Sequence, residues 1–244
     1  MARIYDEQAA SLAYSHDAMK PWQHAVKRAA DILCSLIGLI LLSPIFILFA
    51  VMLKIQRNGP VFFSQKRIGY KGKPFTIYKF RTLSTVVEDE GPQLIAQSDT
   101  VQSTPFEKFL RDHHLDELPQ LWNVLIGNMS LVGPRPERKY YIDQIMEYTH
   151  DYLLIYQMKP GLTSEATIYN GYTDTMEKML KRLDMDIRYL ENRTLRTDLS
   201  IIFQTLGCLF HSTEGQTDNH AKIQRPTPVP VEAGYAETTN NEQF

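Results

Sequence analysis

Cysteine is scarce in this sequence, in which only Cys34 and Cys208 occur among 244 residues. Both stand in apolar segments and are far apart along the chain, so the sequence indicates neither a disulfide framework nor a CxxC metal site. This scarcity fits a reducing, cytoplasmic environment best. Internal repeats are also missing, and the length favours one substantial core over two large domains.

Acidic side chains are missing from residues 54–87, although the whole chain has a formal net charge of only −2. Charge is therefore distributed unevenly, and the overall value conceals this. The basic residues of this stretch are Lys54, Arg57, Lys66, Arg67, Lys71, Lys73, Lys79 and Arg81. We expect the stretch to attract phosphate groups or anionic lipid headgroups.

Charge of either sign is missing from residues 32–53, which form one long apolar run. A straight helix of this length would span a hydrocarbon core of about 30 Å. The run is too long for a cleaved signal peptide, and it is followed by Lys54-Ile-Gln-Arg57 instead of small residues. The sequence therefore predicts a membrane segment.

Two topologies for this segment stay open from residue patterns alone. Ser43-Pro44 stands at its centre, where proline removes a backbone donor and clashes with the carbonyl four residues earlier, so we expect a bend. Basic residues flank both ends, with Lys27 and Arg28 before the run and Lys54 after it. The positive-inside tendency then favours neither crossing direction. A single spanning helix and a re-entrant helix that uses one leaflet both satisfy these observations.

The rest of the chain shows three further patterns. Residues 61–65 and 75–78 are rich in β-forming side chains and are separated by turn residues, which predicts a short hairpin. Residues 175–210 have a mostly helical pattern, whose apolar run 199–210 is too short to span and is either core or an interfacial helix. From residue 211 onward the composition is rich in Thr, Pro, Gln and Asn, which is typical of a disordered tail.

Two helices are expected around the adjacent carboxylates Asp116 and Glu117. The segment Thr104-Pro105-Phe106-Glu107 is a capping box that starts a helix reaching to about residue 112. Helical spacing of apolar residues indicates the next helix, through Leu118, Leu121, Trp122 and Leu125. We expect the two carboxylates in the first turn of this second helix and Trp122 in the core.

The carboxylates Asp116 and Glu117 have two interpretations. Acidic residues at a helix N-terminus complement the helix dipole and need no catalytic role. A helix N-terminus also holds phosphate, and a carboxylate placed there can attack phosphorus. That attack requires cations, either basic side chains or Mg²⁺, to screen the repulsion between like charges. The sequence supplies candidates in Lys79, Arg81, Arg111 and Arg135.

A long central motif resembles a known family. Residues 115–137 read LDELPQLWNVLIGNMSLVGPRPE, with KRAADI before the apolar segment and YKFRTL at the end of the hairpin. Together these closely resemble the bacterial sugar transferases, which are the monotopic phosphoglycosyl transferases or polyprenyl-phosphate sugar phosphate transferases. The similarity extends from about Lys27 to Phe210 and includes the late stretch LDMDIRYLENRTLRTDLSIIFQTL.

The resemblance implies roles for single residues. Asp116 matches the nucleophile that attacks the sugar-linked phosphate of a UDP-sugar, releases UMP and forms a phosphosugar-enzyme intermediate. Glu117 matches the second member of this pair, which either helps to bind Mg²⁺ with Asp116 or assists the incoming lipid phosphate. Ser43-Pro44 matches the motif that bends a re-entrant helix. The residues at basic positions that contact phosphate or nucleotide are Lys79, Arg81, Arg111 and Arg135.

The resemblance also implies a fold and a location. We expect a mainly helical α+β protein, monotopic in the membrane, with a re-entrant helix-break-helix and a short β-hairpin. The expected parts are an N-terminal arm (1–26), the re-entrant membrane helix (27–57), a catalytic domain with interfacial helices (58–210) and a disordered tail (211–244). The catalytic domain would face the cytoplasm at the bacterial inner membrane. About thirty residues precede the apolar run, as in small members that consist of the catalytic core alone.

The expected partners are a UDP-sugar, polyprenyl (undecaprenyl) phosphate and membrane lipids, with Mg²⁺ as the cofactor and no nucleic acid. The reaction would be the first membrane step of surface polysaccharide or glycoconjugate biosynthesis, such as capsule, exopolysaccharide or lipopolysaccharide. Downstream glycosyltransferases and self-association stay open as partners. Ser164 and Ala166 depart from the PGxTGxxQ pattern of many relatives, so the sugar is not inherited from them. The alternatives are a glycosyl transferase that releases UDP and a non-catalytic scaffold for glycan assembly.

Overall fold

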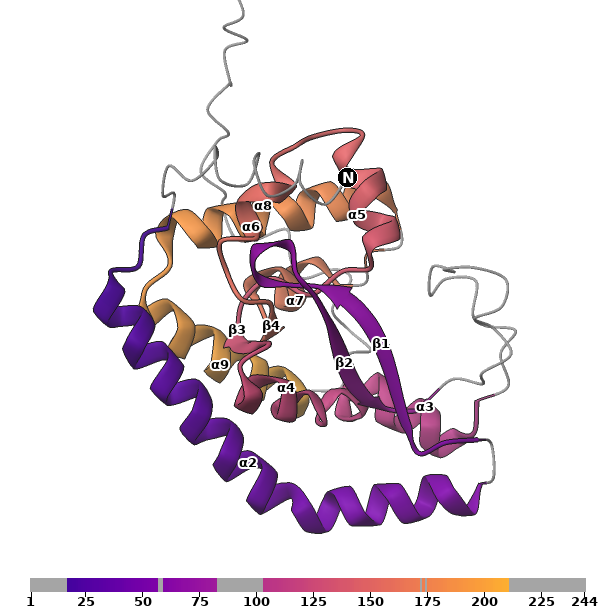
Figure 1. The fold of residues 1–244 in the computed structure, drawn as a ribbon. Coiled ribbons are helices and arrows are strands. Elements are labelled where there is room, and N and C mark those ends of the chain that lie inside the picture. Colours follow the sequence, from indigo (N-terminus) through magenta and orange to yellow (C-terminus); the bar gives the residue numbers. More distant parts are fainter. Residues whose placement is uncertain (1–16, 57–58, 83–102, 172, 174, 211–244) are drawn as a thin grey trace, which may run out of the picture. The chain divides into compact units, whose positions relative to one another are not determined.

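The fold was obtained as a computed structural model, which describes residues 17–56, 59–82, 103–171, 173 and 175–210. Residues 1–16 of the expected N-terminal arm (1–26) and the expected tail from residue 211 lie outside the described residues, and the helix expected from residue 27 already begins at Pro21. The long helix α2 (Pro21–Ile55) comes first in Figure 1. It is followed by β1 (Phe62–Ile68), β2 (Pro74–Phe80), α3 (Pro105–Asp112), η4 (Leu115–Glu117), α4 (Gln120–Ile126), β3 (Ser130–Val132), α5 (Lys139–Met146), α6 (Tyr152–Ile155), β4 (Gly161–Thr163), α7 (Glu165–Asn170), α8 (Met176–Asn192) and α9 (Leu195–Phe210).

Helix α2 is bent but not broken. It stays helical through Pro44, and Figure 1 shows that it changes direction partway along its length. The missing N–H of Pro44 leaves the carbonyl of Ile40 without its helical donor, and the hydroxyl of Ser43 donates to that carbonyl at 2.8 Å. The expected bend is therefore present, whereas the expected interruption of the helix is not.

The first arm of α2 is fixed to the strand β3. The carboxylate of Asp31 accepts hydrogen bonds from the N–H of Leu131 (3.0 Å) and the hydroxyl of Ser130 (3.1 Å). The ammonium of Lys27 donates to the carbonyl of Val132 at 2.9 Å. These contacts involve Ser130, Leu131 and Val132, which are all the residues of β3. The whole strand therefore lies against α2.

The second arm of α2 packs on the same domain. Phe49 and Leu53 are buried in a cluster with Phe80 of β2 and Leu110 of α3. Since both arms are held by one domain, the two ends of α2 lie against the same body of the protein, which is consistent with the expected monotopic fold, and the re-entrant topology stays a prediction. Within the described ranges α2 is the one helix long and apolar enough to cross a bilayer. Its exposed apolar side chains include Leu33, Leu36, Ile37, Ile40, Leu41, Ile45, Ile47 and Leu48.

The expected hairpin is confirmed. Strands β1 and β2 pair antiparallel from Phe62 opposite Phe80 to Ile68 opposite Pro74. A 3₁₀ turn joins them, and its Lys71 N–H donates to a carbonyl of the α6 region at 2.8 Å. The hairpin therefore reaches from the end of α2 to the core beneath α6, as Figure 1 shows.

The main core lies around the short parallel pair β3–β4. Buried side chains from α5, α6, α8 and α9 fill it, among them Ile142, Leu153, Leu190 and Ile201. Gly161 and Gly133 bring the two chains into close contact, because a Cβ on Gly161 would lie 2.1 Å from the backbone nitrogen of Gly133. The architecture is a mainly helical α+β fold, as expected from the sequence.

Besides α2, the helices α4 and α9 also expose apolar side chains. Trp122 on α4 is 50% exposed, so the prediction that it lies in the core is wrong. The neighbouring Asn123 explains the difference, since its amide accepts from Tyr78 N–H (3.2 Å) and donates to the Thr76 carbonyl (2.7 Å). This pairing with β2 turns the tryptophan outward. On α9 the exposed residues at helical spacing are Leu199, Phe203 and Leu206, as in an interfacial helix.

Candidate active site

The two carboxylates lie in a turn of their own, between α3 and α4. Asp116 and Glu117 belong to the 3₁₀ turn η4, and the N-cap residue of α4 is Pro119. Pro119 has no N–H to donate to Leu115, so the chain tightens and Leu118 N–H donates to the Leu115 carbonyl at 3.3 Å instead. The prediction that both carboxylates lie in the first turn of α4 is therefore wrong.

Glu117 forms the fixed part of the site. Its Oε1 accepts from Lys79 Nζ at 2.7 Å and from Arg135 at 2.5 Å, and its Oε2 accepts from Arg135 at 3.1 Å. Burial alone would raise the pKa of Glu117, but the charges and hydrogen bonds of Arg135 and Lys79 hold it well below the usual value. In turn, the charge of Glu117 raises the pKa of Arg135 despite its burial. The fork of Arg135 suits this bidentate contact.

Asp116 is as buried as Glu117 but has different partners. Its side chain is 7% exposed, and no ion pair with it is found within the part of the chain that the structure describes. Burial raises the pKa of Asp116 to about 6, with Lys79 and Arg135 opposing this shift and the charge of Glu117 adding to it. With a pKa of about 6, Asp116 is mainly ionised at neutral pH, and in the described ranges its oxygens pair with no basic side chain.

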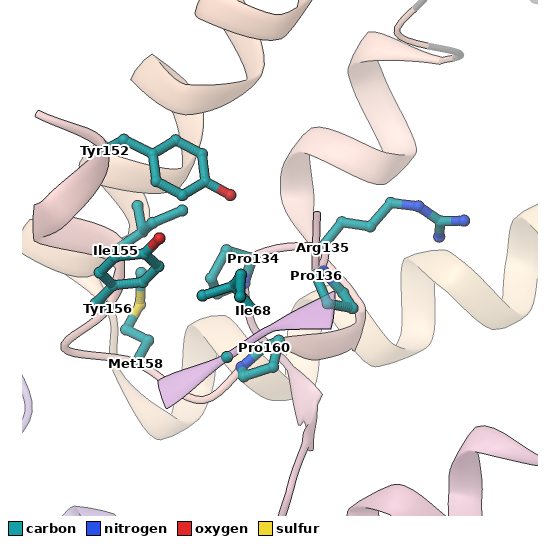
Figure 2. A pocket seen from close by; sticks show the side chains of 10 residues that line it. Ile68, Pro134, Arg135, Pro136, Tyr152, Ile155, Tyr156, Met158 and Pro160 are labelled. Carbon is teal, nitrogen blue, oxygen red and sulfur yellow. The ribbon is translucent and has the colours of Figure 1, made fainter. Parts of the chain in front are cut away.

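The turn that carries Arg135 is stiffened by its prolines. Figure 2 shows Pro134 among the apolar side chains of a small pocket, which come from β1, α6 and the segment before β4. The guanidinium of Arg135 extends away from that pocket in the same view. The turn therefore rests on the core through one face and presents its cation on the other.

The remaining predicted basic residues are not brought to Glu117. Arg81 is 2% exposed, and its guanidinium lies 3.9 Å from the carboxylate of Glu107 at the start of α3. Arg111 lies further along α3 and contacts the hydroxyl of Ser103 at 3.5 Å. The structure thus gathers Lys79 and Arg135 around the acidic pair, whereas the phosphate roles of Arg81 and Arg111 stay predictions.

The sequence patterns did not predict a second set of ion pairs, which is formed by Glu137, the residue directly after Pro134-Arg135-Pro136. Glu137 accepts from Arg182 of α8 at 3.1 Å and from Arg67 of β1 at 3.4 Å. Arg67 was only one of many basic residues in the acid-free stretch, and Arg182 stood in an ordinary helical pattern. The position of Glu137 directly after Pro-Arg-Pro was the one signal available.

The acidic pair can also be tested as a Mg²⁺ site. No group of three or more metal-binding side chains forms among the described residues. Mg²⁺ needs only one or two carboxylates, however, when substrate phosphates and water complete its coordination. In the described part of the chain Asp116 pairs with no basic side chain. Glu117 accepts three hydrogen bonds from Lys79 and Arg135, which leaves it about one of its roughly four acceptor sites, so the donor set fits this ion.

The chain is similar to curated proteins of known and unknown activity. A UDP-glucose:undecaprenyl-phosphate glucose-1-phosphate transferase from Klebsiella pneumoniae is 43% identical over 182 residues, which cover 74% of this chain and 39% of the relative. A UDP-N-acetylgalactosamine-undecaprenyl-phosphate N-acetylgalactosaminephosphotransferase from Aeromonas hydrophila is 35% identical over 83% of this chain and 47% of the relative. An uncharacterized sugar transferase from Bacillus subtilis is 35% identical over 83% of this chain and 96% of its own length.

The relatives differ in how much of their own length aligns with this chain. The aligned region makes up less than half of the first two relatives and nearly all of the third. Residues 22–212 match the family described as bacterial sugar transferase. This region contains the bent membrane helix, the hairpin and the site around Asp116. The chain belongs to the bacterial sugar transferase family.

Proposed function

We propose that the protein transfers a sugar 1-phosphate from a UDP-sugar to a polyprenyl phosphate and releases UMP. The observation that carries this proposal is the unequal acidic pair. Glu117 binds Lys79 and Arg135 and keeps them beside Asp116, while Asp116 itself pairs with no basic side chain among the described residues. The names of relatives such as the Klebsiella transferase support the same reaction class.

In the first half of the reaction, a carboxylate oxygen of Asp116 attacks the phosphorus that carries the sugar. A new bond forms between this oxygen and phosphorus, the bond to the bridging oxygen breaks, and UMP leaves with that oxygen and its electron pair. Lys79 and Arg135 screen the charge of the attacking and leaving oxygens. Because Glu117 already orders both cations, little rearrangement is needed when charge develops.

In the second half, a phosphate oxygen of the polyprenyl acceptor attacks the same phosphorus. The bond to Asp116 breaks, the carboxylate is regenerated, and the product is a polyprenyl diphosphate sugar. Arg135 and Lys79 again lie beside the reacting group, so one set of cations serves both displacements. This two-step path explains why the nucleophile is a carboxylate that pairs with no basic side chain among the described residues.

Mg²⁺ would be held by Asp116 and Glu117 together with substrate phosphate oxygens. When bound, it would neutralise charge on the diphosphate and favour the departure of UMP. Chelation with EDTA should therefore abolish UMP release, and excess Mg²⁺ should restore it. Activity that persists in EDTA would exclude the requirement.

The proposal extends to the location of the reaction. We place the catalytic domain on the cytoplasmic side of the bacterial inner membrane, where nucleotide sugars are made. Support comes from the basic residues at both ends of α2, Lys27 and Lys54, which the positive-inside tendency assigns to the cytoplasm. The acceptor phosphate would then lie at headgroup level, and the product would enter surface glycan assembly as its first membrane-bound intermediate.

The sugar is the least determined part of the substrate. The names of the Klebsiella and Aeromonas relatives specify glucose and N-acetylgalactosamine, respectively. Ser164, where this chain departs from many relatives, serves as the N-cap of α7 by accepting from Thr167 N–H at 3.0 Å. We therefore propose a UDP-hexose or UDP-N-acetylhexosamine and leave the choice to a substrate panel.

The nucleotide product tests the reaction class. The purified full chain is incubated with Mg²⁺, undecaprenyl phosphate and a panel of UDP-sugars, and UMP and UDP are separated by chromatography. We expect UMP from the wild type, none from Asp116→Asn, and normal release from Asp143→Asn, which alters only an exposed pair on α5. UDP as the product would indicate transfer of the sugar alone. UMP release that survives Asp116→Asn would remove Asp116 as the nucleophile.

A further inference from the structure

The turn Pro134-Arg135-Pro136 is followed by an acidic residue, Glu137, that connects it to other elements. Glu137 directly follows the turn that carries Arg135, and its two carboxylate oxygens contact different arginines. Oε1 accepts from Arg182 at 3.1 Å and Oε2 from Arg67 at 3.4 Å. These arginines come from α8 and β1, so a single carboxylate joins the turn to two separate elements.

The backbone of the turn is fixed at the same points. The N–H of Ile68 donates to the carbonyl of Glu137 at 3.1 Å, and the guanidinium of Arg67 donates to the carbonyl of Pro136 at 3.3 Å. At the other end, Gly161 N–H donates to the Pro134 carbonyl at 2.9 Å. Glu137 and its neighbours thus restrain both the side chain and the main chain of the turn.

Electrostatics makes the carboxylate of Glu137 necessary for this arrangement. Burial lowers the pKa of Arg67 to about 10, the charge of Glu137 opposes that shift, and Arg135 adds to it. Arg182 is affected in the same way, with burial lowering its pKa, Glu137 raising it and Arg135 lowering it. Without the negative charge, three guanidinium groups would repel one another in a partly desolvated space.

We propose that Glu137 is a positioning residue, which holds Arg67 and Arg182 so that the turn directs Arg135 toward Glu117 and the substrate phosphate. This inference rests on the proposed function. It adds a third acidic residue to the site, one that contacts no reacting atom. Glu117 binds the guanidinium of Arg135 directly. Glu137 fixes the backbone of the turn through Arg67 and Arg182.

A double-mutant cycle separates positioning from general support of the fold. Arg135→Lys keeps a positive charge but loses the planar fork that contacts Glu117 twice. If Glu137 acts through Arg135, Glu137→Gln should lower kcat for UMP release by about 10- to 100-fold in the wild-type background. In the Arg135→Lys background the same substitution should lower kcat by less than about threefold, because the contact between Arg135 and Glu117 that Glu137 positions is already lost. The KM for the UDP-sugar should change by less than kcat.

Hydrogen exchange supplies a readout that does not depend on activity. In Glu137→Gln the amides of residues 67–69 and those of Gly133, Arg135, Glu137 and Arg138 should exchange faster, while those of α4 stay protected. Asp143→Asn is the matched control, because its carboxylate pairs with exposed Lys139 on the helix that follows, and neither readout should change. Equal losses of kcat in both backgrounds, or unchanged exchange in the turn, would overturn the positioning role. A wild type that releases no UMP would instead overturn the proposed function, and the exchange data would still decide the fate of the inference.

Discussion

At the scale of single residues, Asp116 and Glu117 are neighbours in one buried turn with opposite pKa shifts. Two cations hold the pKa of Glu117 well below its usual value, whereas burial raises that of Asp116 to about 6. A purely structural ion pair would explain the lowered pKa of Glu117 but not the raised pKa of Asp116. The second leaves a desolvated carboxylate that is ionised at neutral pH, which is the state that an oxygen nucleophile needs.

The pKa of Asp116 predicts the pH dependence of the first half-reaction. Only the ionised carboxylate can attack, so the single-turnover rate of UMP release without acceptor should fall as the pH drops through about 6. At pH 5 the rate should be about tenfold lower than at pH 7.5. Rapid-quench measurements with the UDP-sugar alone avoid titration of the lipid phosphate. A flat profile between pH 5 and 7.5 would contradict this prediction.

Thermal stability should respond oppositely to neutralising the two carboxylates. The folded-state pKa of Asp116 lies above its unfolded value, so its contribution to stability is lost as pH rises from about 4 to 6. Ionised Asp116 then destabilises the fold at pH 7.5 by up to about 3 kcal/mol. Glu117 has a lowered pKa, so its charge contributes stability above the unfolded pKa, and this is lost on acidification.

Differential scanning fluorimetry at pH 7.5 tests this contrast. Asp116→Asn should raise the Tm, whereas Glu117→Gln should lower it because Lys79 and Arg135 lose their buried partner. At pH 4.5 the gain from Asp116→Asn should shrink, since wild-type Asp116 is then protonated. A decrease of similar size for both variants at pH 7.5 would show that the two environments are alike.

At the scale of elements, the membrane helix α2 is coupled to the active-site turn through β3. Asp31 and Lys27 hold three consecutive residues of this strand, and the turn with Arg135 begins two residues later. The membrane helix therefore serves as part of the scaffold of the site as well as an anchor. Changes in its first arm should reach the chemistry through this short connection.

The substitution Asp31→Ala should weaken this coupling. It leaves the buried N–H of Leu131 and hydroxyl of Ser130 without their acceptor, at a cost of about 1 to 3 kcal/mol. Asp31→Asn retains an acceptor oxygen and should keep most of the stability and turnover. Both variants should still fractionate with membranes, because the apolar part of α2 is unchanged. Equal turnover by the alanine variant and the wild type would show that β3 does not depend on α2.

The elements that could be predicted from the sequence are those with local signals. The capping box before α3 and the β-forming residues of the hairpin act within a few residues of each other, so their patterns sufficed. The turn η4 was missed because Pro119 disrupts a pattern that otherwise continues as a helix. The outward position of Trp122 depends on Asn123 pairing with β2, which lies 45 positions earlier.

Ion-pair partners that lie far apart in the sequence could not be predicted, because local patterns carry no information about them. The contacts of Glu137 span 70 positions to Arg67 and 45 to Arg182. No local spacing distinguishes these arginines from other basic residues. Position and charge made the acidic pair, Lys79 and Arg135 candidates, and the family resemblance assigned their roles. Charge complementarity then explains how they assemble.

At the scale of the whole molecule, apolar surface is concentrated on the helices nearest the membrane segment. The exposed middle of α2 is joined by exposed side chains on α4 and α9, including Trp122, Ile126 and Phe203. Large exposed apolar areas of this kind mark contact with another apolar phase. We expect α4 and α9 to lie in the headgroup region while α2 enters the bilayer and returns.

Thiol labelling tests this topology. Cysteines are introduced by Lys20→Cys and Pro60→Cys, one at a time, in a background with Cys34→Ala and Cys208→Ala. If both ends of α2 are cytoplasmic, an impermeant maleimide should label neither site in intact cells and both sites in lysates. Labelling of either site from outside would indicate a spanning helix and would contradict the re-entrant topology.

The central claim is that Asp116 carries the sugar phosphate between the two half-reactions. The most direct test is mass spectrometry of the purified protein after incubation with the reactive UDP-sugar and Mg²⁺ but without polyprenyl phosphate. The account predicts a mass increase of one sugar phosphate, located on the peptide that contains Asp116, absent from Asp116→Asn and removed when undecaprenyl phosphate is added. UMP release that occurs only when acceptor is present, with no adduct at any time, would contradict it and indicate direct transfer between the two substrates.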